Sequence, residues 1–433
     1  LFANESGLPL ELESEEVEDD IPSDVYYACL DGNFNYDCDD RFGESKVRND
    51  VENFDEADLY AEVWVGRACV DSEEEISNFV KKTLYQEENS DDYISEILFI
   101  GEDLGTWYDF YYRWGGEYKD DMAYLIPDQF NLQTFYDRDH PDNNWYPSEL
   151  YNEILNIQPQ IINHDGHGYT NYMLKMGSDS FYEFENEKPF FIYSHSCLTG
   201  SFDNFIPGDS YLEQDCIAEV ITCEIEYGAF ACILNARYGL GSENDPVSPS
   251  GAYDESFYKA LFEENIKNLG HANHYSKEDN IWRIDQNGYR WCYYQTNLFG
   301  DPELRIKDPE EQAPTKPSRP AGESQGKINE EYTFTSSSTD PNGKKLYYKW
   351  DFGDGTFSEW IGPYNSSENC EVKHIWDYQG NFQIKVIAKN SNELVSEWSN
   401  PLSLTMPKSK FLIFNFLSDL MDLFPNLKNS FVI

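Results

Sequence analysis

Basic residues are scarce in this chain. Its 433 residues include 31 lysines and arginines against 81 aspartates and glutamates, which gives a net charge of −50. A surface this acidic repels phosphate-rich polymers and anionic lipids, so nucleic acids and anionic membranes are excluded as partners. Cations and basic peptides are favoured instead.

Long apolar runs are also absent, because no stretch approaches the ~18 consecutive apolar residues that cross a bilayer. The first residues lack the basic and apolar regions of a secretory signal, and residues 1–20 carry eight acidic and no basic side chains. They are expected to form a disordered acidic arm. Residues 407–433 have an apolar face at helical spacing, interrupted by Asp419 and Asp422. This amphipathic tail is expected to pack on the body or on a partner, with an interfacial membrane anchor as the alternative.

Cysteine pairing is not set by the sequence. Nine cysteines leave at least one thiol unpaired, and Cys197 is the candidate. Spacing fixes no connectivity, so buried free thiols and disulfides both remain open for the other eight.

The apolar pattern changes once along the chain. Residues 21–307 alternate strand-like with helical runs, which predicts an α/β fold with a mainly parallel sheet. Predicted strands are Leu59–Val65, Ile97–Ile100, Gln160–Asn163, Phe190–Ser194 and Ala229–Leu234, and predicted helices are Glu73–Gln86, Cys216–Tyr227 and Tyr253–Asn265. Residues 308–320 form a proline-rich linker, and short alternating runs over 321–406 predict an all-β sandwich.

Two short segments carry the chemistry. HDGHG at 164–168 and FFIYSHSC, which ends at Cys197, each follow an apolar strand-like run. A histidine and a cysteine should therefore emerge at the ends of two adjacent strands. A thiol with a pKa of about 8.5 is a weak nucleophile at neutral pH, and a neighbouring imidazole makes it a thiolate. Gly168 lets the backbone approach a substrate carbonyl, so the pattern predicts a Cys-His peptidase.

Further landmarks surround these segments in a fixed order. They are IPSDVYYACLDGN (21–33), YAEVWVGRACV (60–70), GHG (166–168), HSCLTGSFD (195–203), CIAE (216–219), LNARYG (234–239) and LFGDPELRI (298–306). With them, residues 22–306 resemble the gingipain-type cysteine peptidases of the caspase-like clan. Family members carry a further α/β segment upstream, which suggests a processed or truncated chain.

The resemblance implies a caspase-like α/β/α sandwich and assigns two catalytic residues. His167 is the family's catalytic histidine and Cys197 its nucleophile, and the N–H groups of Gly168 and Cys197 would form the oxyanion hole. Only His167, and not His164, is followed by the glycine that such a backbone needs. Catalysis needs no cofactor in this scheme.

The second domain resembles a PKD-type, immunoglobulin-like module. The resemblance rests on WDFGDG (350–355) and HIWDYQGNFQIKVIAKN (374–390). It implies an extracellular protein in which this module is a spacer or adhesive unit. Cell-surface association through the module or through the tail is expected, and proteins or peptides are the expected substrates.

The sequence pattern gives weaker support to the remaining candidate site residues. Glu102 follows a strand-like run and is the candidate for a third catalytic residue, with a solvated loop glutamate as the alternative. The family often prefers a basic side chain before the cut, and Asp120 and Asp121 lie in the corresponding region, with Tyr238 as a pocket wall. In so acidic a chain a pair of aspartates is common, and Arg237 beside Tyr238 speaks against a basic-residue pocket.

Alternating oxygen ligands suggest a structural calcium ion in the segment DGNFNYDCDDRFGE. The candidates are Asp31, Asn33, Asn35, Asp37 and Asp39. The segment lacks the loop glycine of an EF-hand, and a plain acidic turn is the alternative.

Two other functions compete with a secreted cysteine endopeptidase. His164, Asp165, His167 and His195 could be ligands of a zinc hydrolase, although this would leave Cys197 unexplained. The other alternative is a surface adhesin with a degenerate, non-catalytic peptidase domain.

Overall fold

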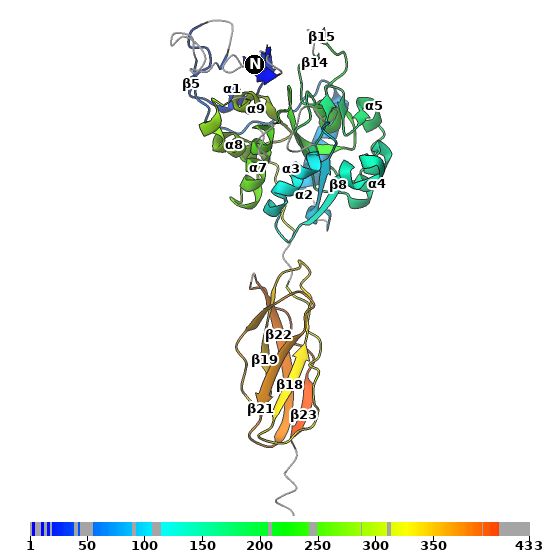
Figure 1. The fold of residues 1–433 in the computed structure, drawn as a ribbon, viewed down its shortest axis with the longest axis vertical. Coiled ribbons are helices and arrows are strands. Elements are labelled where there is room, and N and C mark those ends of the chain that lie inside the picture. Colours follow the sequence, from blue (N-terminus) through cyan, green and yellow to red (C-terminus); the bar gives the residue numbers. More distant parts are fainter. Residues whose placement is uncertain are drawn as a thin grey trace, which may run out of the picture. The chain divides into compact units, whose positions relative to one another are not determined.

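The structure is a computed structural model that describes residues 2–406, apart from 5–9, 13–14, 18–19, 39–41, 44–54, 89–91, 106–113, 207–209, 242–248, 287, 310–312 and 392. The chain divides into two compact units, Leu1–Pro309 and Glu310–Ile433 (Figure 1). This division falls inside the stretch predicted to be a linker. The C-terminal tail lies outside the described residues.

A six-stranded sheet forms the centre of the first unit. Its strands, in spatial order, are β17 (Thr296–Phe299), β16 (Ala229–Asn235), β13 (Phe190–Ser194), β9 (Ile161–Asp165), β7 (Glu96–Gly101) and β8 (Asn131–Tyr136). Neighbouring strands from β16 to β8 run parallel, and β17 runs antiparallel to β16. Every residue of β9, β13 and β16 is buried, as expected of parallel strands covered on both faces.

Helices cover both faces of this sheet. Leu98 and Ile162 pack on one face with α4 (Pro147–Ile157), α5 (Ser178–Phe181) and α6 (Ile217–Glu219). Phe99 and Phe191 pack on the other face with α3 (Gly115–Met122), α7 (Pro249–Phe262) and α8 (Leu269–Asp279). Alternate side chains of each strand thus enter opposite cores. The predicted α/β/α sandwich is confirmed.

The remaining elements of the first unit are short, except for one helix. The helices are α1 (Val25–Ala28), α2 (Glu73–Glu88) and α9 (Tyr289–Gln295). The strands are β1 (Phe2–Asn4), β2 (Leu10–Leu12), β3 (Glu15–Val17), β4 (Asp20–Pro22), β5 (Gly32–Asn33), β6 (Glu56–Ala57), β10 (Gly168–Tyr169), β11 (Tyr172–Met173), β12 (Met176–Gly177), β14 (Phe205–Ile206) and β15 (Ser210–Tyr211).

Three predictions of local structure were wrong. The acidic arm, predicted to be disordered, includes short strands, of which β1 pairs with β4 and β2 with β3. Residues 59–65 form no strand: the N–H groups of Glu62 and Val63 donate to the Ala28 carbonyl instead of to a sheet partner. The helix predicted from Cys216 is only the short α6, followed by a π-helical turn, Val220–Glu224.

The second unit is an antiparallel sandwich of two sheets (Figure 1). One sheet pairs β18 (Glu331–Ser336) with β21 (Cys370–Ile375). The other has the order β20 (Ile361–Tyr364), β19 (Leu346–Asp351), β22 (Gly380–Asn390) and β23 (Leu402–Met406). Buried residues alternate along β19 and β22, and Trp350 and Trp376 lie in the core between the sheets. The predicted all-β sandwich is confirmed.

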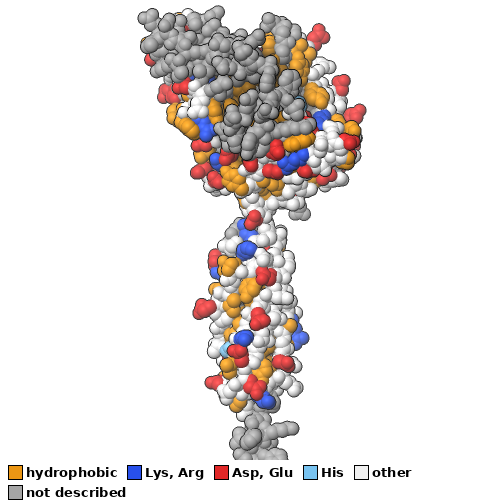
Figure 2. All heavy atoms as spheres, viewed as in Figure 1, with side chains coloured by type: hydrophobic (Ala, Val, Ile, Leu, Met, Phe, Trp, Pro, Cys, Tyr) orange, Lys and Arg blue, Asp and Glu red, His pale blue; other side chains and the backbone are white. Residues whose placement is uncertain are grey.

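The surface is acidic, as the net charge of the sequence predicts. Figure 2 shows acidic side chains spread over the visible face of both units. None of the nine cysteines, all within the described residues, forms a disulfide. Within the described residues, no helix has the length and apolar character needed to cross a membrane.

Candidate active site

The two chemistry-bearing segments leave the sheet side by side. β9 and β13 are adjacent and parallel, and His164 pairs with Ser194 in their register. Because both strands end at the same edge, His167 and Cys197 follow within three residues of this last pair. The prediction that the two segments follow adjacent strands is confirmed.

Gly168 brings the histidine loop against the cysteine loop. A Cβ atom at position 168 would lie 2.6 Å from Cβ of Ser196 and 2.7 Å from Cγ2 of Thr199. The Cys197 carbonyl oxygen would lie 2.9 Å away. Contacts below about 3 Å cannot be accommodated, so only glycine permits this approach of the two loops.

The Cys197 thiol lies under a third loop, which follows β16. The N–H of Gly239 donates to Sγ of Cys197 over 3.3 Å, and the N–H of Leu198 donates to the Arg237 carbonyl. Gly239 is also needed for space, because a Cβ there would lie 2.0 Å from the His195 carbonyl oxygen. The thiol contact of Gly239 was not predicted, although this glycine closes the LNARYG landmark.

The surroundings of the Cys197 thiol act on its pKa in opposite directions. Burial raises the pKa of the Cys197 thiol above its usual value, and the Asp165 carboxylate adds to this effect. The hydrogen bond from Gly239 works in the opposite direction but does not outweigh burial. A thiol in this setting needs a base to accept its proton when it attacks.

The two histidines of the HDGHG segment have different surroundings. His167 is exposed, and its Nε2 lies 3.1 Å from the Asp103 carbonyl oxygen. His164 is fully buried, with Nε2 3.1 Å from Oε1 of Glu102 and Nδ1 2.8 Å from Oγ of Ser194. Only the His167 ring is accessible to a substrate.

Glu102 belongs to this cluster, but its contacts differ from the expected ones. The residue follows β7 and is 2% exposed. Its Oε2 accepts a hydrogen bond from the backbone N–H of His167 over 3.2 Å, and its Oε1 faces the His164 ring. Glu102 therefore holds the His167 backbone, whereas the expected third residue would orient the His167 ring.

The two aspartates proposed to bind a basic substrate side chain have different surroundings in the structure. Asp121 lies in a pocket of about 80 Å³ whose wall includes His195 and Glu255. Asp120 is exposed and forms an ion pair with Arg138. Both are on α3, but only Asp121 belongs to a pocket that reaches the cysteine loop.

Tyr238 and Arg237 also have defined partners. The Tyr238 ring stacks on Trp291, with centroids 6.4 Å apart. Arg237 is 1% exposed, and its guanidinium binds both carboxylate oxygens of Asp203 at 2.7 and 3.1 Å. Because this charge is paired and buried, Arg237 no longer speaks against a pocket for a basic side chain.

A buried carboxylate behind the cysteine loop was not predicted. Asp254, on α7, lies 2.7 Å from Nζ of Lys119 and 3.1 Å from Nε2 of His195. Burial opposes its ionisation, but the Lys119 and His195 charges outweigh burial and lower the pKa of Asp254 to about 2. No sequence motif marks this residue, because its partners come from distant parts of the chain.

The residues proposed as zinc ligands have separate partners. His164 uses both ring nitrogens on Glu102 and Ser194, His167 faces the Asp103 carbonyl, and His195 lies between Asp254 and Asp165. Across the part of the chain that the structure describes, one group of histidine, cysteine or acidic residues is close enough to hold a metal, and it lies elsewhere. The geometry does not favour the zinc alternative.

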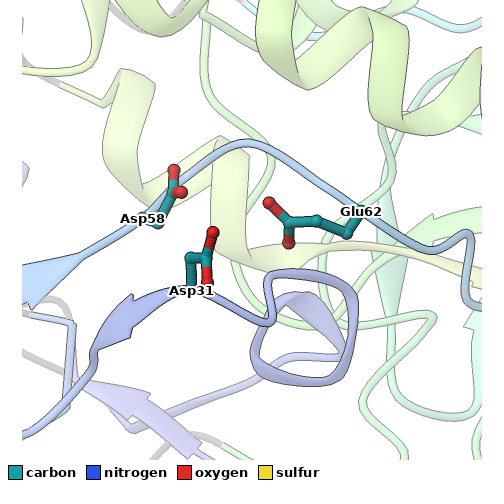
Figure 3. A group of neighbouring side chains, drawn as sticks. All are labelled: Asp31, Asp58 and Glu62. Carbon is teal, nitrogen blue, oxygen red and sulfur yellow. The ribbon is translucent and has the colours of Figure 1, made fainter.

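That group is Asp31, Asp58 and Glu62, whose carboxylates face one another (Figure 3). Their oxygens lie within 4.8 Å of one another. The predicted calcium loop contributes only Asp31 to this group. Asn33 instead accepts a hydrogen bond from the N–H of Asn35, Asp37 is not in the group, and Asp39 lies outside the described residues.

A known protein family matches each of the two units. The model of peptidase family C25 matches residues 5–307, and that of the PKD domain matches residues 320–400. The PKD domain of an M14-like peptidase from Thermoplasmatales archaeon SCGC AB-540-F20 is 37% identical over 23% of this chain and 100% of its own, with a TM-score of 0.22. The complex of the pro- and mature domains of RgpB from Porphyromonas gingivalis is 16% identical over 79% of this chain and 78% of its own, with a TM-score of 0.47.

A search of curated proteins gave no match. The C25 match covers well over half of the chain and includes every residue of the candidate site. The chain therefore belongs to peptidase family C25, the gingipain family of cysteine peptidases, and its sequence continues with a PKD domain after the peptidase domain.

Proposed function

We propose that this cysteine peptidase is a secreted endopeptidase whose catalytic dyad is His167 and Cys197. The contact of Gly168 with the cysteine loop carries the proposal, because it brings an exposed imidazole and a half-buried thiol to one edge of the sheet. The acidic surface and the PKD domain support an extracellular location, with cell-surface association through the PKD domain or residues 407–433.

The reaction follows from the groups around the thiol. As Cys197 attacks the scissile carbonyl, its proton passes to His167 and an S–C bond forms. The negative oxygen is stabilised by the N–H groups of Gly168 and Cys197. His167 then protonates the leaving amine, the C–N bond breaks, and water hydrolyses the acyl-enzyme.

The raised pKa of Cys197 gives His167 its role in this scheme. Because burial raises the pKa of the Cys197 thiol, a base that accepts its proton during attack favours the reaction. His167 is the exposed imidazole beside the cysteine loop, whereas His164 is buried and bonded through both ring nitrogens.

A fluorogenic peptide library tested on the wild type and on Cys197→Ala distinguishes an enzyme from a binding protein. We expect internal peptide bonds to be cut by the wild type and by no Cys197→Ala preparation. A chain that turns over no peptide and whose Cys197 does not react with iodoacetamide is instead the non-catalytic adhesin.

The substrate preference rests on the pocket beside the cysteine loop. The pocket is lined by the carboxylates of Asp121 and Glu255. Glu255 is paired with Lys259 over 2.9 Å, and the Lys119 charge is paired with Asp254. We propose that this pocket takes an Arg or Lys side chain before the cut, bound by Asp121.

Asp120 supplies a matched control for the preference, since it lies one position away and pairs with Arg138. Asp121→Asn should lower kcat/KM for Arg and Lys peptides by roughly 10–100-fold, the value of a charged hydrogen bond. Asp120→Asn should leave it unchanged. Equal effects of the two variants, or equal turnover of Ala and Arg peptides by the wild type, would contradict this assignment.

A further inference from the structure

A chain of buried polar contacts runs from the histidine loop to the cysteine loop. Glu102 accepts from the N–H of His167 and faces Nε2 of His164 at 3.1 Å. Nδ1 of His164 lies 2.8 Å from Oγ of Ser194, which lies 2.8 Å from Oγ of Ser196. The last contact joins Ser196 to Thr199 over 3.0 Å between hydroxyl oxygens. The chain thus begins at the backbone of His167 and ends on both sides of Cys197.

His164 is the centre of this chain, and each of its ring nitrogens contacts one polar side chain. A carboxylate accepts hydrogen bonds, so Nε2 of His164 holds the proton shared with Glu102. Nδ1 can then accept from the Ser194 hydroxyl. Ser194 in turn accepts from the N–H of Ser196 over 3.1 Å. One imidazole therefore orients a group in each catalytic loop.

The backbone is built closely around the pair of His164 and Glu102. A Cβ at Gly166 would lie 2.4 Å from Nε2 of His164 and 2.5 Å from Cδ of Glu102. Glycine at this position lets the loop turn directly over the pair. The pair is fully enclosed, with His164 at 0% and Glu102 at 2% exposure.

We propose that His164 is a positioning residue for the peptidase reaction. Through Glu102 and Ser194 it holds the His167 backbone and the Cys197 loop at one fixed spacing. The proposal rests on the proposed dyad of His167 and Cys197. Because a displacement of about 1 Å between reacting groups costs on the order of a hundredfold in rate, loss of this link lowers kcat far more than it changes KM.

The test uses the full chain with His164→Gln and two measurements. The first is kcat and KM on the best library peptide. We expect kcat to fall about a hundredfold and KM to change less than about threefold, the pattern of a lost transition-state interaction. The second is the rate at which iodoacetamide alkylates Cys197 across the pH range, followed by mass spectrometry of the Cys197 peptide.

Alkylation separates positioning from a structural effect and needs no substrate. In the wild type, His167 assists loss of the thiol proton at neutral pH, so His164→Gln should slow alkylation about tenfold near pH 6.5 and slow it less as the pH rises. A loosened fold exposes the thiol and speeds alkylation at every pH. That result, or an unchanged kcat, would overturn the proposal.

Three further variants keep the outcome decisive. His274→Gln is the matched control, because His274 is a buried histidine (4% exposed) on α8 outside the polar chain. It should lower Tm and leave both measurements unchanged. If His164→Gln does not fold, Ser194→Ala removes one hydroxyl from the same chain and should give a smaller loss with the same pH pattern. If His167→Ala leaves alkylation at neutral pH unchanged, the proposed dyad is wrong. An unchanged kcat in His164→Gln contradicts only the positioning role of His164.

Discussion

The two units bury different kinds of side chain. In the peptidase unit, the buried set includes the ionisable residues Glu102, Lys119, Arg237 and Asp254, all near the carboxyl edge of the sheet. In the PKD domain, the core is aromatic and aliphatic, and the buried polar residues among those described are Ser336, Ser338, Asp340, Asn390 and Ser399. Burying an ion costs several kcal/mol unless it is well paired. The peptidase unit thus depends on the pairing of buried ions around its candidate site, whereas the PKD domain depends mainly on apolar packing.

The difference also shows where each unit is sensitive to change. A buried ion network depends on distances between a few groups, so small displacements alter chemistry before they alter folding. An apolar core depends on volume, so removing a large side chain alters folding first.

The largest effect is expected in the PKD core. Trp350 is fully buried between the two sheets, and Trp350→Ala should lower the free energy of unfolding of this domain by about 3–5 kcal/mol. Peptide turnover at 25 °C should not change. Calorimetry and a fluorogenic assay measure the two effects, and the half-buried Trp398→Ala is the control. A parallel loss of turnover in Trp350→Ala would break the contrast.

The next effect concerns a buried acid behind the catalytic loops. Burial raises the pKa of Glu219 to about 7, with the Cys216 N–H opposing and Asp215 adding to the shift. Glu219 is on α6, whose first N–H groups donate to the carbonyls of Thr170 and Thr199, one in each catalytic loop. This acid therefore lies where its charge affects both loops.

The sign of the pH effect follows from the raised pKa. The unfolded chain releases this proton near pH 4.5 and the folded chain near 7, so the stability contribution is complete below 4.5 and is lost as pH rises through 7. The loss is about 3 kcal/mol. In Glu219→Gln, stability should fall less between pH 4.5 and 7.5 than in the wild type. Identical urea-denaturation profiles at pH 4.5 and 7.5 for the two proteins would contradict the assignment.

Much of the fold could be predicted because strand position depends on local pattern. Apolar runs such as Phe190–Ser194 are long enough for a buried strand and too short for a helix, and all of β13 is buried. The same reasoning failed at residues 59–65, where alternation resembled a strand but no strand among the described residues pairs with the segment: Val63 and Trp64 are 41% and 38% exposed. Pattern indicates whether a segment can pair, and tertiary structure decides whether it does.

The candidate site could be derived from sequence only where its residues belong to compact motifs. His167, Gly168 and Cys197 lie in compact motifs, and the register of β9 and β13 brings those motifs together. Asp254 and the true contacts of Glu102 involve side chains that approach through the folding of separate elements. Their residue types are common in so acidic a chain, so no local signal separates them from solvated carboxylates.

A glycine substitution in each unit compares their tolerance directly. Gly168→Ala would place Cβ 2.6 Å from Ser196 and force the catalytic loops apart. We expect kcat to fall about a hundredfold, equivalent to about 2.7 kcal/mol. Gly343→Ala in the PKD domain meets no atom within 4 Å and should cost only about 1 kcal/mol in stability, for its backbone φ of +71°. Full activity in Gly168→Ala would show that the loop contact is dispensable.

The smallest effect concerns calcium, which we propose binds at Asp31, Asp58 and Glu62 (Figure 3). Hard cations prefer oxygen ligands, and these three carboxylates also repel one another when no cation is present. At a calcium concentration ten times Kd, binding should add about 1.4 kcal/mol to the stability of the peptidase unit. Chelation should lower its Tm, and calcium rather than magnesium should restore it.

Asp58→Asn should abolish this response, whereas Asp37→Asn, in the loop predicted from sequence but outside the group, should keep it. If Asp37→Asn abolishes the response and Asp58→Asn keeps it, the calcium ligands are those of the loop predicted from sequence. The group of Asp31, Asp58 and Glu62 would then bind no calcium.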